Sequence, residues 1–228
     1  MQGLSPHGLI RQVSLQEVGA LLLEQFQQWG MPRAIRSDNG SPLGVPSRSV
    51  IPIISLWLAA WGVRHILNRP RRPTDNPNVE NNQHTSARWA EIYKCQSLAQ
   101  MQEQLDQACV YQRDFFKVSR LGNATRKQVY ARLYDNPRQF DPKLFDEQKA
   151  YQLLAQAVYP RKISDNGVIT LYDKPFSVGR EHRGKITFVV FSPAELAWIC
   201  LSPEKEILKV IPDPRFSKEN IYNLTVCQ

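Results

Sequence analysis

Two acidic residues, Asp38 and Glu80, stand at positions where a carboxylate could do chemistry. Asp38 follows a short run, "AIRS", and precedes Asn39-Gly40, which is a strong turn signal, so its side chain is expected at the exposed end of a strand. Glu80 comes four residues after Asn76, and Asn76-Pro77 is typical of a helix start. Carboxylate oxygens are the ligands that Mg²⁺ prefers. If the fold brings the two side chains together, they predict a magnesium site.

Each acid also has a purely structural explanation. A Ser-Asp-Asn-Gly sequence is commonly only a turn, and an acid in the first turn of a helix complements the helix dipole. The residue types alone therefore leave both interpretations open.

The surrounding pattern predicts the elements that would position these acids. Ser14 and Glu17 form a capping box, and the following apolar spacing predicts a helix that Gly30 ends. We expect strands over 33–38 and 63–67, with a buried helix after Pro52 between them. A helix beginning at Asn76 is expected to run to about residue 117, as two consecutive helices.

The second half of the chain changes character. Residues 119–155 alternate basic and turn-forming residues and are interpreted as a basic connector. Six short β-rich runs separated by turn signals then follow over 156–212, which is typical of a small barrel. We therefore expect an α/β region followed by an all-β domain, an SH3-like β-barrel at 156–228.

Composition excludes several classes of protein. The chain has 228 residues, of which 42% are hydrophobic, enough for a real core. Its longest apolar run, "VIPIISLWLAAWGV", is too short for a membrane span, so we expect no membrane partner. The four cysteines are far apart, which indicates reduced thiols and a cytoplasmic protein rather than a zinc site or a disulfide framework.

The charge favours a polyanionic partner. Lys and Arg number 29 against 21 Asp and Glu, a net charge of +8. A solvated face explains any single cluster, but the clustering also predicts double-stranded DNA as a partner. The candidate nucleic-acid-binding residues are Arg64, Arg69, Arg71, Arg72, Arg88, Arg113, Lys117, Arg120, Arg126 and Lys127.

Three strings occur in order: "GMPRAIRSDNGSP", "WGVRHILNRPRRPTDNPNVENNQHT" and "RKISDNGVITLYDKPFSVG". Together they resemble the DDE transposases of insertion sequences, which are similar to retroviral integrases, with a Mu-transposase-like barrel after the catalytic core. The resemblance implies a partial RNase H-like integrase core over residues 1–118. It also implies that Asp38 and Glu80 are the second and third metal-binding acids, that Mg²⁺ is the cofactor, and that His65 and Asn76 help to shape the site.

The sequence departs from that family in three ways. Only 37 residues precede Asp38, so the family's first acid has no counterpart, and the core is expected to be N-terminally truncated. Asn81 stands where the family has Arg, and Ala87 stands where a basic residue often contacts DNA, although Arg88 is adjacent. The strand at 33–38 would then have an unpaired edge, which favours a homo-oligomer or another transposition protein as partner.

Three functions remain open. The first is a truncated DDE transposase-like protein that binds DNA and is catalytically incomplete alone. The second is an active transposase that integrates DNA by Mg²⁺-dependent phosphoryl transfer, with a partner supplying the missing acid. The third is a protein-interaction accessory of a transposition system, since SH3-like folds serve several functions.

Overall fold

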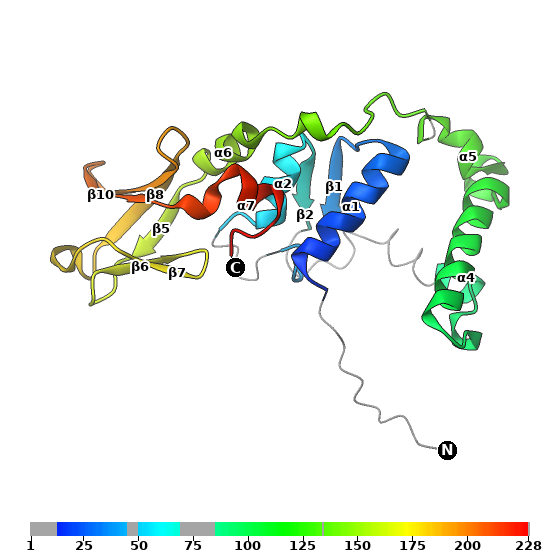
Figure 1. Ribbon diagram of the computed structural model, residues 1–228, viewed down its shortest axis with the longest axis horizontal. Helices are drawn as coiled ribbons and strands as arrows, with labels where there is room; N and C mark the ends of the chain where they lie inside the picture. Colours follow the sequence, from blue (N-terminus) through cyan, green and yellow to red (C-terminus); the bar gives the residue numbers. More distant parts are fainter. Residues whose placement is uncertain (1–12, 45–49, 69–84, 134, 228) are drawn as a thin grey trace, which may run out of the picture. The chain divides into compact units, whose positions relative to one another are not determined.

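The computed structural model describes residues 13–44, 50–68, 85–133 and 135–227. These residues form two compact units (Figure 1). Unit 1 combines Met1–Gln28, Pro32–Leu67 and Phe140–Gln228, and unit 2 combines Trp29–Met31 with Asn68–Gln139. The expected core at 1–118, connector at 119–155 and barrel at 156–228 remain predictions about domain boundaries, and the contacts group the chain differently.

Unit 1 begins with the predicted α/β elements, α1 (Leu15–Trp29), β1 (Ala34–Ser37), α2 (Ile53–Ala60) and β2 (Arg64–Leu67). The capping box is present, because the Ser14 N–H donates to Glu17 Oε2 at 2.8 Å and the Glu17 N–H donates to Ser14 Oγ at 3.2 Å. The two strands pair in parallel, with Ile35 opposite His65. Gly62 allows the turn from α2 into β2, since its φ of 69° lies in the left-handed region.

α2 is the centre of the first core of unit 1. Seven of its eight residues are buried, and the Trp57 ring stacks on Phe26 of α1 with ring centroids 6.2 Å apart. Two segments from the far end of the chain, α6 (Glu147–Ala155) and α7 (Lys218–Tyr222), also pack against α2, as Figure 1 shows. The Trp57 indole N–H donates to the carbonyl of Tyr222 at 3.0 Å.

α6 is a helix that the sequence pattern does not predict. The pattern over 119–155 predicts only a connector, but its last part is a helix with Asp146 as N-cap and with Ala150, Tyr151 and Leu154 buried. Those three residues have the spacing of one helix face, and the basic and polar residues around them obscured that spacing.

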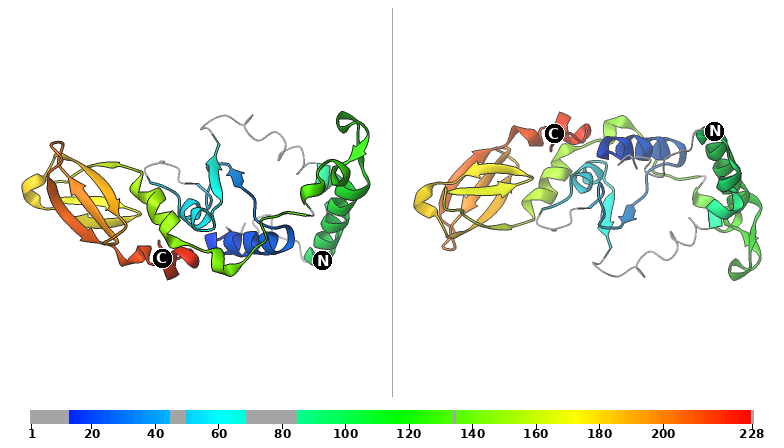
Figure 2. Two further views of the ribbon diagram at one scale, coloured as in Figure 1. Left: turned by 90° about the horizontal axis from the view of Figure 1, so that it is seen from above. Right: turned by 90° about the horizontal axis from the view of Figure 1, so that it is seen from below.

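The six β-rich runs of the second half all form strands. They form a four-stranded antiparallel sheet in the order β10-β9-β8-β5 and a separate two-stranded hairpin, β6-β7. The hairpin lies beside the sheet in each view (Figure 2). The strand bounds are Tyr159–Lys162 (β5), Val168–Leu171 (β6), Lys174–Ser177 (β7), Ile186–Ser192 (β8), Ala197–Leu201 (β9) and Ile207–Pro212 (β10).

The sheet and hairpin share a second, aromatic core. Trp198 of β9 is fully buried, with Phe191 at 4.9 Å and Phe216 at 5.4 Å between ring centroids. Phe216 belongs to η8 (Pro214–Phe216), and the Tyr151 hydroxyl of α6 donates to its carbonyl at 2.9 Å. This contact joins the second core to α6, and through α6 to α2.

A buried ion pair sits beside that core. Asp213 has no exposed surface, and its carboxylate accepts from Arg215 at 2.8 and 2.9 Å and from the Trp198 indole at 3.0 Å. Burial alone would raise the pKa of Asp213, but the hydrogen bonds from Arg215 and Trp198 outweigh it and hold that pKa below its usual range. Arg215 also donates to the Tyr172 carbonyl, which ties the hairpin to this site.

Unit 2 is mainly helical. Residues 85–89 are helical and are separated from α4 by residues 90–97, which contain turns and η2, so the predicted long helical stretch is interrupted. The remaining elements are η2 (Ile92–Lys94), α4 (Leu98–Val110), a π-helical turn η3 (Tyr111–Phe115), β3 (Lys117–Val118), η4 (Ser119–Leu121), β4 (Ala124–Thr125), α5 (Arg126–Val129) and η5 (Ala131–Leu133). A second capping box, Thr125 with Gln128, starts α5.

The observed fold is therefore a mixed α/β structure, which agrees with the predicted class at that level. Two short single-turn helices complete unit 1, η6 (Pro142–Leu144) and η7 (Arg180–His182). In the part of the chain that the structure describes, no helix has the length and apolar character that a bilayer crossing requires.

Candidate functional site

Asp38 lies where the sequence predicts it, directly after β1 and exposed to solvent. Its Oδ1 accepts the backbone N–H of Gly40 at 3.1 Å, so the carboxylate closes the turn that carries the chain away from the strand end. The Leu43 and Gly44 N–H groups then donate to the Gly40 carbonyl at 3.0 and 2.9 Å. The side chain is thus fixed by local hydrogen bonds and keeps acceptor capacity toward solvent.

Behind this turn, three side chains form a hydrogen-bonded chain. His65 of β2 has Ser37 Oγ 2.9 Å from Nε2 and Ser55 Oγ 2.7 Å from Nδ1. The Ser37 hydroxyl donates to the Asp38 carbonyl at 2.8 Å. Since that proton is committed, Ser37 Oγ must accept from Nε2–H, and Nδ1 of the neutral ring then accepts from Ser55. The network therefore specifies one tautomer of a neutral imidazole.

The environment of His65 favours that neutral form. Ser37 and Ser55 are buried and the ring is half-buried, and this burial lowers the pKa of His65. His65 is therefore a positioning residue, which holds β1, β2 and α2 in register just before Asp38. The sequence predicts a role for His65 in the site only through the family resemblance, and it predicts none for Ser37 or Ser55.

The second predicted acid, Glu80, lies outside the described residues, as do Asn76 and the arginines Arg69, Arg71 and Arg72. Among the residues that the structure does describe, no three His, Cys, Asp or Glu side chains gather as metal ligands. Asp38 therefore fits a hard cation by its exposure and free acceptor capacity, but the described residues do not place a second carboxylate beside it.

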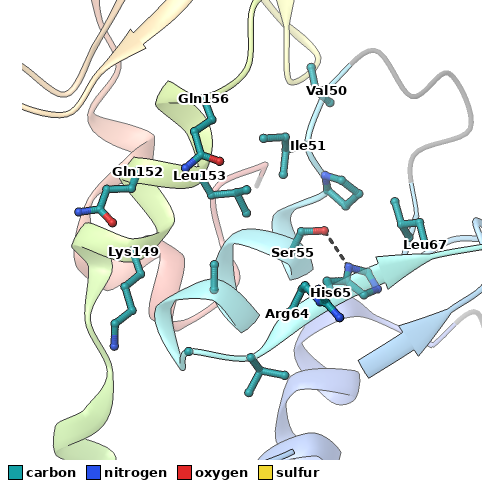
Figure 3. Close-up of a pocket in the computed structure, with 14 residues that line it drawn as sticks. Val50, Ile51, Ser55, Arg64, His65, Leu67, Lys149, Gln152, Leu153 and Gln156 are labelled. Carbon is teal, nitrogen blue, oxygen red and sulfur yellow. Dashed lines mark hydrogen bonds between the residues drawn. The ribbon is translucent and has the colours of Figure 1, made fainter. Parts of the chain in front are cut away.

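A groove of about 620 Å³ opens on the other side of the network (Figure 3). It lies between α6 and the α2–β2 connection, and the His65–Ser55 pair lies in its floor. Arg64 and Lys149 stand toward one end of the groove, and its lining as described contains no carboxylate. The apolar lining residues are Val50, Ile51, Pro52, Ala59, Val63, Leu67 and Leu153. Because α6 was not predicted, neither was this groove.

The remaining predicted DNA contacts are divided between the units. Arg64 is exposed on β2 of unit 1. In unit 2, Arg88, Lys117, Arg120 and Lys127 are exposed. Two predicted residues hold internal positions instead.

Arg113 pairs with Asp114 at 2.9 Å and stacks over the Trp29 ring, 5.0 Å from its centroid. Arg126 donates to the Gln112 carbonyl at 2.9 Å, which fixes α5 against η3. These two guanidinium groups therefore stabilise unit 2.

The exposed cations of unit 2 are concentrated in one segment. Residues 116–133, which we call the basic segment, contain Lys117, Arg120, Arg126, Lys127 and Arg132 and no Asp or Glu. They cover β3, the turn through η4, β4, α5 and η5. Four of the five cations are exposed, Arg126 being the exception.

Comparison with known proteins adds no family. No protein-family model matches the chain, and no curated protein matches it.

Proposed function

We propose that this protein binds double-stranded DNA and that it acts in DNA transposition, as a DDE transposase-like protein that needs a further acid for catalysis. The observation that carries the proposal is the basic segment, in which four exposed cations occur over 18 residues with no acid among them. Cations at this density release condensed counterions from duplex DNA, which drives binding without reading base sequence.

Hydrogen bonds that fix the backbone of the basic segment support this role. Arg126 is held by the Gln112 carbonyl, and Thr125 and Gln128 cap α5 reciprocally, with bonds of 2.9 and 3.2 Å. The exposed cations on either side are therefore presented from fixed backbone. The resemblance of "AIRSDNG" and the later strings to DDE transposases gives DNA as the polyanion.

The test is the salt dependence of binding to a fluorescently labelled 30-base-pair duplex. One variant replaces Lys117, Arg120, Lys127 and Arg132 with Gln. The control replaces four exposed cations of unit 1 with Gln, namely Arg183, Lys185, Lys205 and Lys209. Both variants lose the same charge, so only the location of the DNA contacts distinguishes them.

We expect the wild-type affinity to fall steeply with salt. The slope of log K against log salt should become shallower by about 0.9 for each phosphate contact that the first variant loses. In the control variant, the slope should change by less than about 0.9, the change expected for the loss of one phosphate contact. A flat salt curve, or equal losses in both variants, would contradict DNA binding through the basic segment.

A second candidate function, Mg²⁺-dependent strand transfer, is favoured by the geometry around Asp38. The Ser37–His65–Ser55 network fixes the strand end, and the Asp38 carboxylate is exposed beyond it. Bound Mg²⁺ would activate the attacking oxygen and stabilise the leaving one. Asp38 would hold it together with Glu80, for which the resemblance is the only support, and each hard ion needs about six oxygen ligands.

We expect the chain alone not to join DNA ends in Mg²⁺ or Mn²⁺. The measurement is a strand-transfer assay that compares the wild type with Asp38→Asn and Glu80→Gln. Divalent-dependent joining by the wild type that either substitution abolishes would replace the proposed role with an enzymatic one. Adding a candidate partner protein then tests whether another polypeptide completes the site.

A further inference from the structure

The π-helical turn of unit 2 displays two stacked aromatic rings to solvent. The ring centroids of Tyr111 and Phe115 are 6.3 Å apart with an angle of 20° between the ring planes. The two side chains are 53% and 66% exposed. Large apolar rings that remain this accessible as a pair are a feature of interaction sites rather than of a solvated face.

Trp89 packs against one ring of the pair, Tyr111, and against the neighbouring Phe116. Trp89 contacts Tyr111 edge to face at 5.5 Å and contacts Phe116 in the same way at 4.8 Å. Tyr111 and Phe115 are four residues apart, one turn along η3, so they share a face. Trp89 therefore orders the Tyr111 ring and Phe115 stacks on Tyr111, so a ligand that used the pair would restrict few additional side-chain rotamers.

Cations of the basic segment alternate with aromatic rings on the elements joined to this turn. Lys117 follows Phe115 by two residues, and Phe116 lies between them. Lys127 of α5 and Tyr130, the residue that ends this helix, are three residues apart, and both are exposed. The Arg126–Gln112 hydrogen bond holds α5 against η3.

Two acids lie near the rings among the described residues, and they differ in their partners. Asp114 of η3 pairs with Arg113. Asp106 borders the shallow apolar hollow that also includes Val110, Tyr111 and Phe115. A carboxylate repels phosphate, but it can accept hydrogen bonds from the N–H groups of unpaired bases, such as the N3–H of thymine. The arrangement therefore indicates how a strand would be oriented. Its bases would face Tyr111 and Phe115, and its sugar-phosphate backbone would face the basic segment.

We infer that unit 2 binds unpaired bases of single-stranded DNA, which stack on Tyr111 and Phe115 while the basic segment contacts the phosphates. The inference rests on the proposed DNA-binding function and adds a class of substrate to it. The base faces of duplex DNA are stacked on one another and inaccessible, so a duplex would contact only the cations of the basic segment. Single strands would use both, as stacking on aromatic side chains is sequence-tolerant and strong. Duplex ends with unpaired overhangs would combine the two modes.

The experiment measures the affinity of the full chain for labelled dodecathymidylate and for a 12-base-pair duplex, at one salt concentration. Phe115→Leu keeps the apolar volume and removes the π face, and Tyr111→Leu does the same for the other ring. The matched control is Tyr93→Leu, which removes another exposed ring, 75% accessible, in η2. Circular dichroism melting checks that each variant is folded.

We expect Phe115→Leu to weaken oligothymidylate binding about tenfold, in line with the loss of one stacked base. Duplex affinity should stay within about twofold, and Tyr93→Leu should change neither. Binding of duplex but not of oligothymidylate by the wild type, or unchanged oligothymidylate affinity in both ring variants, overturns the inference and leaves the proposed function intact. Binding of neither DNA overturns both. If the rings instead meet another protein surface, both ring variants leave both DNA affinities unchanged, which is again the overturning result.

Discussion

Unit 1 buries its aromatic side chains, whereas unit 2 exposes many of its own. Trp57, Trp61 and Trp198 of unit 1 are each at most 1% accessible. Among the described residues of unit 2, the only buried side chains are Met31, Asn68, Ala90, Ala108, Gln112 and Thr125. Tyr93, Tyr111, Phe115 and Tyr130 there are more than half exposed. The difference shows that aromatic residues build stability in one unit and are available for contacts in the other.

The largest expected effect is on an aromatic of the unit 1 core. Trp198→Ala should lower the free energy of unfolding by about 3 to 5 kcal/mol, because it opens a cavity in contact with Phe191 and Phe216. Phe115→Ala in unit 2 should change it by less than about 0.5 kcal/mol, since the ring is exposed. Urea unfolding followed by circular dichroism measures both values. Similar losses of unfolding free energy in the two variants would contradict the difference between the units.

A buried charge gives the next largest effect. Arg215→Met should lower the free energy of unfolding by about 3 kcal/mol at pH 7. The substitution leaves the carboxylate of Asp213 buried, with the Trp198 indole as its one remaining side-chain donor among the described residues. The double variant Asp213→Asn, Arg215→Met should recover part of that loss.

In the wild type the lowered pKa of Asp213 means that this stabilisation is present above the unfolded value, about 3.9. It is lost as the pH falls through the lower folded value. A cost below about 1 kcal/mol for Arg215→Met would show that the pair is not desolvated.

The titration of His65 has a smaller effect. The pKa of His65 is lowered in the folded state, so the unfolded chain binds its proton more tightly. The free energy of unfolding should therefore decrease as the pH falls below about 6.5, by at most about 1.4 kcal/mol per pH unit. His65→Gln should show a shallower dependence between pH 7 and 5 in unfolding titrations. Identical slopes would mean that the Ser37–His65–Ser55 network takes up the proton without cost.

The smallest expected effects concern the capping box, which occurs once in each unit. Ser14→Ala and Thr125→Ala each remove the side-chain oxygen of a capping box, which is worth about 1 kcal/mol. In unit 1 the loss should leave α1 protected, because Phe26 packs on Trp57. In unit 2 the four-residue helix α5 should open locally, which amide hydrogen exchange of residues 126–130 would detect. Equal protection after both substitutions would contradict the weaker packing of unit 2.

Local signals in the sequence predicted local structure well. The capping box at Ser14, the turn after Asp38 and the six strand runs depend on neighbouring residues, and each is present. Helix α6 was missed because its three buried residues are spaced among polar ones. An RNase H-like core and an SH3-like barrel remain predictions beyond the observed mixed α/β fold.

The site was predictable only in part for the same reason. The position of Asp38 follows from its own turn, but the partners of His65 come from 10 and 28 residues away, which no short pattern encodes. The groove needs α6, which begins 80 residues after the end of β2. Long-range contacts of this kind depend on packing, so motif spacing could not reveal them.

The hydrogen bonds to the last described segment affect the order in which this protein can fold during synthesis. The Gln16 side chain donates to the Leu224 carbonyl, and the Trp57 indole donates to that of Tyr222. α1 and α2 thus leave the ribosome long before the segment that covers them, and they carry an apolar surface meanwhile. Nascent chains with such a surface are substrates for chaperones and prone to aggregate. Unit 1 therefore completes its first core only after translation has passed residue 224, whereas the contacts of unit 2 lie within Trp29–Gln139 and can form earlier.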